Sequence, residues 1–107
     1  DELVSHLFDP SSRAVIEMLA TIVRGARAAG RSAQICGELA GDPDYAGLLL
    51  GLGITEFSLP PGQLAAVKAT LRRTDAGKCR ECVAAFLADP ENIDGRALLS
   101  DLARFRR

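Results

Sequence analysis

A cysteine at the end of a predicted strand is the residue in this sequence best placed for chemistry. Cys36 ends the short apolar run 32–36, and Gly37 follows it without side-chain bulk. Reactive groups collect where parallel strands end and loops begin, so a small substrate could approach the thiol there. The helix predicted to begin near Pro43 would direct backbone N–H groups toward the same face. The alternative interpretation is that Cys36 is a small buried apolar residue that ends a core strand.

A second candidate is the pair Cys79 and Cys82, which has the spacing of some redox and zinc motifs. A zinc site needs about four ligands, and a thioredoxin-type pair stands at a helix start that follows a strand. This pair instead falls inside a predicted helix, with Cys79 on the apolar face. We therefore predict that both are core or surface residues of that helix.

Two carboxylates follow Cys36 closely in the sequence. Glu38 and Asp42 could orient a substrate or bind a metal ion. Such side chains more often cap the next helix and accept hydrogen bonds from loop N–H groups. The capping role is the interpretation that we favour.

The elements that must position these residues follow from hydrophobic spacing. Apolar residues recur at helical spacing between residues 11 and 29. The short runs 32–36 and 54–59 are predicted strands. Further helices are predicted over 42–52, 63–73, 75–88 and 93–105, between glycine and proline breaks. Side chains assigned to the apolar helix faces include Met18, Leu19, Ile22, Val23, Leu64, Val67, Cys79, Val83 and Phe86.

This order of elements, with three helices after the second strand, predicts an α/β fold with parallel strands. Two strands leave edges of unpaired N–H and C=O groups and do not make a stable sheet in water by themselves. The missing strands must therefore come from the rest of a larger barrel or from other copies of this chain.

The amino-acid composition indicates the broad class of protein. At 107 residues, 48% of them hydrophobic and 25% charged, the chain is one globular domain or a piece of one. A formal net charge of -1 gives no field that gathers nucleic acid or an anionic membrane. A membrane span needs about 18 consecutive apolar residues, and no apolar run is that long. A signal peptide begins with positive charge, whereas this sequence begins with two acidic residues. We therefore expect a cytoplasmic protein. Three cysteines, an odd number, suggest reduced thiols, and Asp1 in place of Met suggests a piece of a longer protein.

Two stretches carry a resemblance to a known family. Ile35 to Pro43, ICGELAGDP, and Leu48 to Leu59, LLLGLGITEFSL, resemble the end of the phosphoenolpyruvate-binding barrel of enzyme I. Enzyme I is the phosphoenolpyruvate-protein phosphotransferase of the bacterial sugar phosphotransferase system. The leading SHLFDPSS at Ser5 to Ser12 is similar to the loop and helix start before that strand.

The resemblance implies a fold and its limits. Residues 1–90 would be the C-terminal part of a (β/α)8 TIM-type barrel, with two parallel strands and flanking helices. Residues 91–107 would be a helical C-terminal extension. The segment after Pro90 departs from the ending that we expect for the family.

The resemblance also implies a role for Cys36, because the cysteine of this motif is the acid–base residue at the substrate carbon in enzyme I. After the phosphoryl group leaves phosphoenolpyruvate, the enolate must gain a proton on carbon. A thiol of reference pKa about 8.5 is still mostly protonated at neutral pH and could supply it.

Other family properties are implied only for a parent enzyme. That enzyme uses Mg²⁺, acts as a homodimer and passes its phosphoryl group to the histidine-containing phosphocarrier protein. The arginines and carboxylates that bind substrate and metal in the family have no counterpart here, so we expect the isolated chain to lack activity. The phosphorylated histidine of the family stands in a Thr-Ser-His-x-Ala context, which His6 does not match. We expect His6 to be a loop or interface residue.

A function of another class stays open. A non-catalytic module could have kept this part of the fold for association, using its strand edges to form oligomers or to complete a partner's barrel. The basic ending Arg104-Phe105-Arg106-Arg107 could contact an acidic partner, although charge runs at a terminus are usually solvated.

Overall fold

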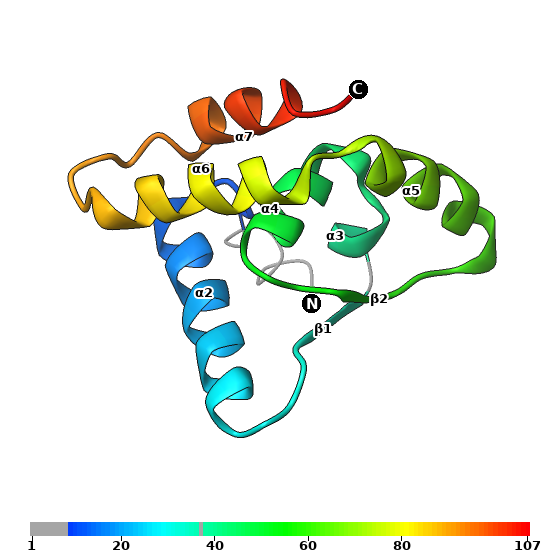
Figure 1. Ribbon diagram of the computed structural model, residues 1–107, viewed down its shortest axis with the longest axis horizontal. Helices are drawn as coiled ribbons and strands as arrows, with labels where there is room; N and C mark the ends of the chain where they lie inside the picture. Colours follow the sequence, from blue (N-terminus) through cyan, green and yellow to red (C-terminus); the bar gives the residue numbers. More distant parts are fainter. Residues whose placement is uncertain (1–8, 37) are drawn as a thin grey trace.

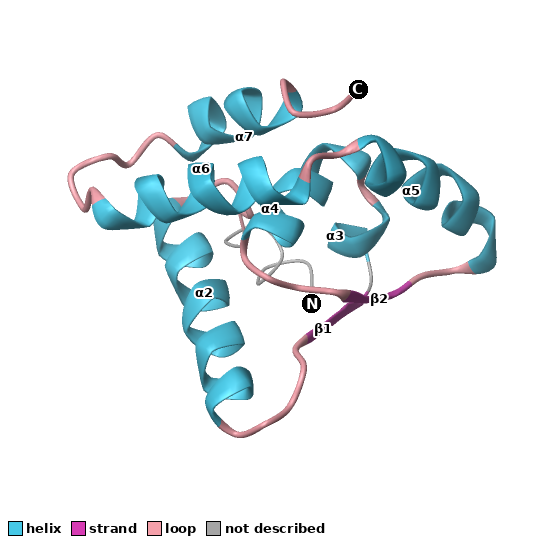
Figure 2. Ribbon diagram, viewed as in Figure 1, coloured by secondary structure: helices cyan, strands magenta, loops and turns pink. Residues whose placement is uncertain are grey.

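The computed structural model describes residues 9–36 and 38–107 of the chain. Figure 1 shows α6 and α7 on one side of α4 and the two strands on the other side. In chain order the elements are α2 (Arg13–Ala28), β1 (Gln34–Cys36), α3 (Glu38–Gly41), the 3-10 helix η1 (Pro43–Tyr45), α4 (Ala46–Gly51), β2 (Glu56–Ser58), α5 (Pro61–Arg73), α6 (Ala76–Ala88) and α7 (Gly95–Ala103). Helices therefore dominate the described chain (Figure 2).

α2 forms where hydrophobic spacing predicted a helix. The Ser12 hydroxyl accepts a hydrogen bond from the Val15 backbone N–H at 3.2 Å and caps the first turn. Gly30, with a φ of 71°, turns the chain after the helix. Met18 and Ile22 belong to the apolar face by spacing, but they are 47% and 53% exposed. The apolar surface of α2 is thus wider than the described residues cover.

β1 and β2 form a two-stranded parallel sheet, as predicted. Each strand has 3 residues, fewer than the runs 32–36 and 54–59 suggested. The pairs are Gln34 with Glu56, Ile35 with Phe57, and Cys36 with Ser58. Because the strands are parallel and in register, both end at the same edge of the sheet.

The helix predicted over 42–52 starts as expected, with Asp42 as its cap and Pro43 in its first turn. It forms as η1 followed directly by α4, whereas α3, which lies before it, was not predicted. Asp42 is extended, with φ -96° and ψ 112°. A residue before proline is disfavoured in helical conformation, and proline has no N–H to continue a helix. Pro43 therefore stops α3 and starts a new, short helical turn.

The main apolar core lies between α2, α4, α6 and α7. Leu48 of α4 is at its centre and is 0% exposed. A Cβ on Gly51 would lie 2.5 Å from Val83 Cγ2 and 2.7 Å from the Cys79 carbonyl O, so α4 approaches α6 closely because residue 51 lacks a side chain. The buried members of this core are Ile16, Leu19, Ala20, Leu48, Leu52, Cys79, Val83, Phe86, Leu98 and Leu102.

Arg13 joins the start of α2 to the end of α6. Its guanidinium donates hydrogen bonds to the carbonyl oxygens of Phe86 at 2.9 Å, Leu87 at 3.1 Å, Asp89 at 2.8 Å and Asn92 at 2.8 Å. The cation also lies 4.7 Å from the centroid of the Phe86 ring. Arg13 thus ties the first turn of α2 to carbonyl groups of the last turn of α6 and of the turn after it.

The helices of the second half follow the predicted ranges within about two residues, the usual uncertainty of helix ends. α5 begins at Pro61, a residue favoured in the first turn. Its Val67 is buried as predicted, whereas Leu64, assigned to the same apolar face, is 41% exposed. No helix in the described ranges is long and apolar enough to cross a membrane. The boundary at residue 90, between the barrel part and the helical C-terminal extension, stays a prediction.

Candidate functional site

The carboxyl edge of the two strands is the candidate site, because Cys36 lies there. Cys36 is the last residue of β1 and pairs with Ser58, the last residue of β2. The Cys36 backbone therefore stands where the sequence predicted, at the point where strands end and loops begin. His6, Gly37 and the side chains of Cys36 and Glu38 lie outside the described part of the chain, so the roles assigned to them stay predictions.

The loop that follows Cys36 is built from α3 and η1. The Asp42 carboxylate accepts a hydrogen bond from the Asp44 backbone N–H at 3.0 Å and caps η1. The Tyr45 backbone N–H donates to the Asp42 carbonyl O at 3.1 Å. These contacts confirm the capping role favoured for Asp42.

Tyr45 is a loop residue that the sequence analysis did not single out as a site residue. Burial raises the pKa of its phenol, and the carboxylates of Asp42, Asp9 and Asp44 add to that effect. The phenol is therefore held neutral at ordinary pH and is able to donate a hydrogen bond. In the sequence, the position of Tyr45 in the same turn as the predicted cap Asp42 was the signal that could have marked it as a site residue.

Two other parts of the chain touch this loop. The Gln63 side chain of α5 lies so close to Gly41 that a Cβ at residue 41 would collide with it. Arg106 Nη2 donates to the Pro43 carbonyl O at 2.9 Å and lies 3.9 Å from Asp44 Oδ1. The expectation that the basic ending is solvated is wrong for Arg106, whose side chain is 27% exposed.

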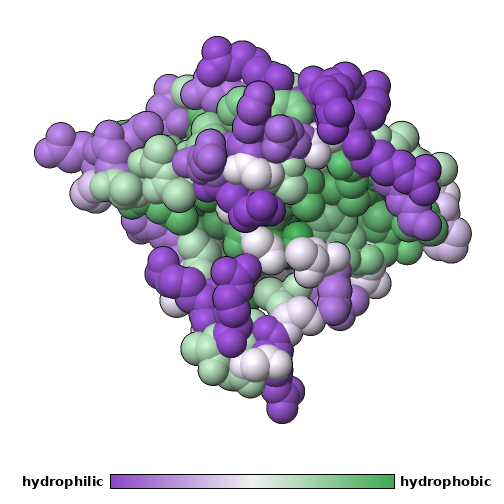
Figure 3. All heavy atoms as spheres, viewed as in Figure 1, coloured by the Kyte–Doolittle hydropathy of each residue, from purple (hydrophilic) through white to green (hydrophobic). Residues whose placement is uncertain are grey.

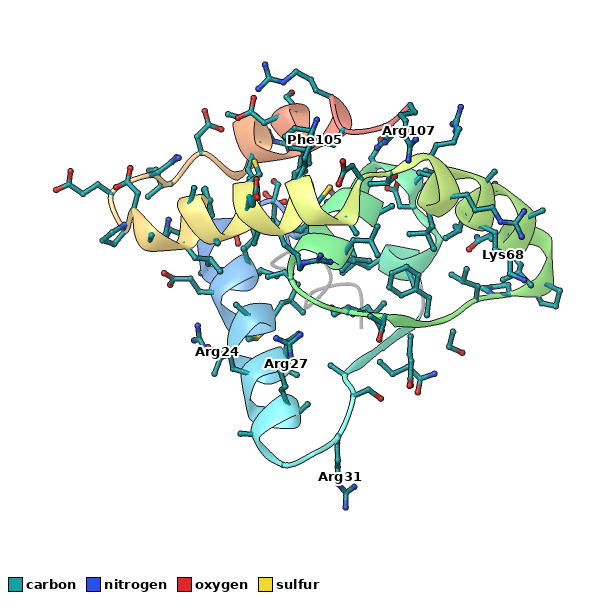
Figure 4. All side chains as sticks on the ribbon, in the orientation of Figure 1. Arg24, Arg27, Arg31, Lys68, Phe105 and Arg107 are labelled. Carbon is teal, nitrogen blue, oxygen red and sulfur yellow. The ribbon has the colours of Figure 1, made fainter. Side chains whose placement is uncertain are left out.

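The C-terminal tail is itself held in place. Its backbone forms an antiparallel bridge between Thr74 and Arg106. The Asp75 N–H donates to the Phe105 carbonyl O at 2.9 Å, and the Arg107 N–H donates to the Arg73 carbonyl O at 2.7 Å. The Phe105 side chain packs against the main core, and Figure 4 shows it beside α6. The tail is therefore a fixed element of the fold.

A cleft of about 400 Å³ separates part of this loop from α7. Charged groups of both signs surround it, with a small apolar area from α7. The lining residues are Asp42, Asp44, Tyr45, Arg96, Leu99, Ser100, Ala103 and Arg106. Arg106 thus belongs both to the cleft and to the contact with the loop backbone.

The cysteine pair lies inside α6, as predicted, and both thiols are free. Cys79 is 0% exposed, and burial, followed by the charges of Cys82 and Asp75, raises the pKa of its thiol. Within residues 9–36 and 38–107, no group of three or more His, Cys, Asp or Glu side chains could hold a metal ion. The core role is confirmed for Cys79.

Basic and apolar side chains lie on different parts of the surface that the figures show. Arg24 and Arg27 lie on the C-terminal half of α2, Arg31 lies on the loop after it, and Lys68 lies on α5 (Figure 4). Figure 3 shows hydrophobic side chains gathered between α6 and α5, with hydrophilic ones around them. Basic groups and an apolar area thus lie apart on this face.

Comparison with known proteins gives one family. A family described as “PEP-utilising enzyme, PEP-binding domain” matches residues 1–76. The phosphoenolpyruvate-protein phosphotransferase of Cupriavidus necator is 42% identical over 106 residues, which are 97% of this chain and 18% of that protein. Multiphosphoryl transfer protein 1 of Escherichia coli K12 is 44% identical over 78 residues, 73% of this chain and 9% of that protein.

A third relative, the phosphoenolpyruvate-protein phosphotransferase of Buchnera aphidicola, is 36% identical over 81 residues, 76% of this chain and 14% of that protein. The chain thus spans less than a fifth of the length of these relatives. Because the Cupriavidus alignment covers 97% of the chain, it includes most of residues 91–107. The departure from the family that was expected after Pro90 stays a prediction.

Proposed function

The chain belongs to the PEP-utilising enzymes, within their phosphoenolpyruvate-binding domain, and from this premise we propose that it is the last part of a phosphoenolpyruvate-protein phosphotransferase barrel. In this proposal Cys36 donates a proton to the enolate of pyruvate. The observation that carries the proposal is the place of Cys36 as the last residue of β1, at the edge where barrel enzymes assemble their reactive groups.

The proposed step balances with one proton. Transfer of the phosphoryl group from phosphoenolpyruvate to a protein histidine leaves the enolate. A C–H bond forms at the enolate carbon as the S–H bond of Cys36 breaks, and the electron pair stays on sulfur as a thiolate. Pyruvate is the product, and solvent returns the proton to the thiol. In the reverse direction the thiolate takes the proton from the pyruvate methyl group.

The sheet supports a larger barrel. Two strands of 3 residues each form the sheet, and both leave a lateral edge without a partner among the described strands. Six more parallel strands would close these edges in a (β/α)8 barrel. The exposed Met18 and Ile22 on α2 offer apolar surface to a neighbouring helix of that barrel.

The other parts of the reaction belong to the whole enzyme. The groups that bind phosphoenolpyruvate and Mg²⁺ would come from residues upstream of this chain, since the described residues hold no cluster able to bind a metal ion. Mg²⁺ would supply charge stabilisation to the transferring phosphoryl group. We likewise propose three properties of the whole enzyme from its family. These are homodimer formation, transfer of the phosphoryl group to the histidine-containing phosphocarrier protein, and a role in sugar transport.

The test is Cys36→Ala in the complete product of the reading frame that encodes these residues. With phosphoenolpyruvate and Mg²⁺, we expect pyruvate formation to fall by about a hundredfold or more, because general acid catalysis contributes about 10²–10⁴-fold. Cys82→Ala, which changes a thiol of α6, is the matched control and should keep the wild-type rate. Wild-type turnover in the Cys36→Ala protein overturns the proposal.

The strand edges also favour a second candidate, a non-catalytic module that associates through them. Size measurement of the complete reading-frame product by analytical ultracentrifugation, together with its phosphoenolpyruvate binding and turnover, separates the two. A reading-frame product that forms oligomers but neither binds phosphoenolpyruvate nor makes pyruvate supports the module. Pyruvate formation by that product excludes it.

A further inference from the structure

We infer that Arg106 is a positioning residue for the loop after Cys36, so that the C-terminal tail determines where the candidate acid–base group stands. The catalytic consequence rests on the function proposed above. The contact itself does not, because it joins two parts of the described chain. Arg106 and Cys36 are 70 positions apart in the sequence, and the fold brings the tail to the loop.

The contact is a charge-assisted hydrogen bond to the backbone. Arg106 Nη2 donates to the Pro43 carbonyl O at 2.9 Å. The same oxygen accepts the backbone N–H of Ala46, which closes η1. Hydrogen bonds from an ionised donor are shorter and stronger than neutral ones. Arg106 therefore restrains the Pro43 carbonyl group, which accepts the backbone hydrogen bond that closes η1.

A carboxylate reinforces the contact. Asp44 Oδ1 lies 3.9 Å from Arg106 Nη2, and the Asp44 side chain is 82% exposed. An exposed pair of this kind contributes little by itself. The backbone contact through Pro43 is thus the larger part of the interaction, and Asp44 adds to it.

The tail offers Arg106 a rigid base. Residue 106 stands in the antiparallel bridge with Thr74, and its neighbours Phe105 and Arg107 each have a backbone hydrogen bond to residues 73–75. One helix turn away, Leu102 is 3% exposed. Because the tail is anchored without the loop, its contact with Pro43 restrains the loop.

The loop needs such a restraint. Between β1 and η1 the chain has only Gly37, the 4-residue helix α3 and Asp42. A single helical turn is marginal in water without tertiary contacts. Gln63 against Gly41 supports it from α5, Leu39 and Tyr45 pack against the main core, and Arg106 holds the backbone at Pro43 from the tail.

The first test measures the loop directly in the complete reading-frame product. Arg106→Ala should speed amide hydrogen exchange at Tyr45 and Ala46 about tenfold, because a hydrogen bond to a charged group is lost. Arg104→Ala is the matched control, since Arg104 pairs with Asp101 at 3.0 Å and its side chain is 73% exposed. It should leave exchange at both amides unchanged. Equal exchange in the wild-type and Arg106→Ala chains overturns the inference.

The second test measures turnover in the complete reading-frame product. The substrate-binding groups are proposed to lie upstream, so Arg106→Ala should lower kcat for pyruvate formation about tenfold or more while KM for phosphoenolpyruvate stays within about twofold. Exchange of the pyruvate methyl protons with deuterated water should fall in parallel. Arg106→Lys, which keeps a charged donor but loses the planar fork, should restore part of kcat.

The outcomes separate the inference from the proposed function. If Cys36→Ala keeps turnover, the proposed function fails and the catalytic part of the inference fails with it, whereas the exchange result still decides the contact. If Cys36→Ala is inactive and Arg106→Ala has the wild-type kcat, the inference fails alone. Equal melting temperatures of the Arg106→Ala and Arg104→Ala proteins would show that a lower kcat does not come from unfolding.

Discussion

The helical side of the molecule and the strand side differ in how much of their own surface they bury. α2, α4, α6 and α7 enclose ten buried side chains in one core, whereas Val23, Leu49 and Ile54 are the buried members of the smaller cluster near the strands. Ile35 and Phe57 of the strands are half-buried. The helical side therefore has a core of its own, and the strand side buries less apolar surface among the described residues.

The two sides also differ in what they contribute, because the helical side holds the larger core and the strand side holds the candidate reactive residue. The candidate catalytic backbone position, at Cys36, lies on the less covered side. The tail and α7 belong to the well-packed side and reach the loop after Cys36 through Arg106. The packed helices thus serve as the frame against which this small loop is held.

The largest effect that tests this comparison is expected from Leu48→Ala. Leu48 is 0% exposed in the main core, so the free energy of unfolding should fall by about 2–5 kcal/mol in a urea titration. Ile35→Ala on β1 removes the same number of carbon atoms from a half-buried side chain and should cost about 1–2 kcal/mol. Equal losses would contradict the contrast between the two sides.

A smaller effect is expected where α4 meets α6. Gly51→Ala would place a Cβ 2.5 Å from Val83 Cγ2 and 2.7 Å from the Cys79 carbonyl O, which should destabilise the chain by about 1–3 kcal/mol. Gly25→Ala is the control, since a Cβ on this α2 residue would meet nothing within 4 Å. It should stabilise the chain by about 0.5–1 kcal/mol. Thermal unfolding followed by circular dichroism distinguishes the two, and a neutral Gly51→Ala chain would mean that the helices separate easily.

The smallest effect is expected from the buried thiol of α6. Burial raises the pKa of Cys79 above its ordinary value of 9.0, so the folded chain holds the proton more tightly than the unfolded chain. The resulting stabilisation is fully present below pH 9 and is lost as the pH rises through the raised pKa. Urea unfolding between pH 8 and pH 11 should show this decline in the wild-type chain and a shallower one in Cys79→Ala. Identical pH profiles would be evidence against a buried, protonated thiol.

Local sequence signals predicted the parts of the fold that depend on neighbouring residues. The limits of α2 and α6 follow from Ser12 and Asp75, which cap their first turns. The burial of Cys79 follows from helical spacing. Helical spacing was insufficient for Met18, Ile22 and Leu64, because exposure depends on which neighbours are present and not on the element alone.

The contacts around the candidate site were harder to predict. The Asp42 cap and the helix start at Pro43 are local and were predicted, but the one-turn helix α3 before them was not. Arg106 was interpreted as part of a solvated ending. Its contact with Pro43 joins residues 63 positions apart, and no spacing rule connects two residues so distant in the chain.

Arg13 has a consequence for the order in which the chain can assemble. Its four carbonyl partners lie 73 to 79 residues downstream. During synthesis the first turn of α2 leaves the ribosome long before those carbonyls exist, so its guanidinium waits in water until residue 92 has emerged. Contacts of such long sequence separation slow folding, and the contact between α2 and the end of α6 can form only after residues 86–92 have been made.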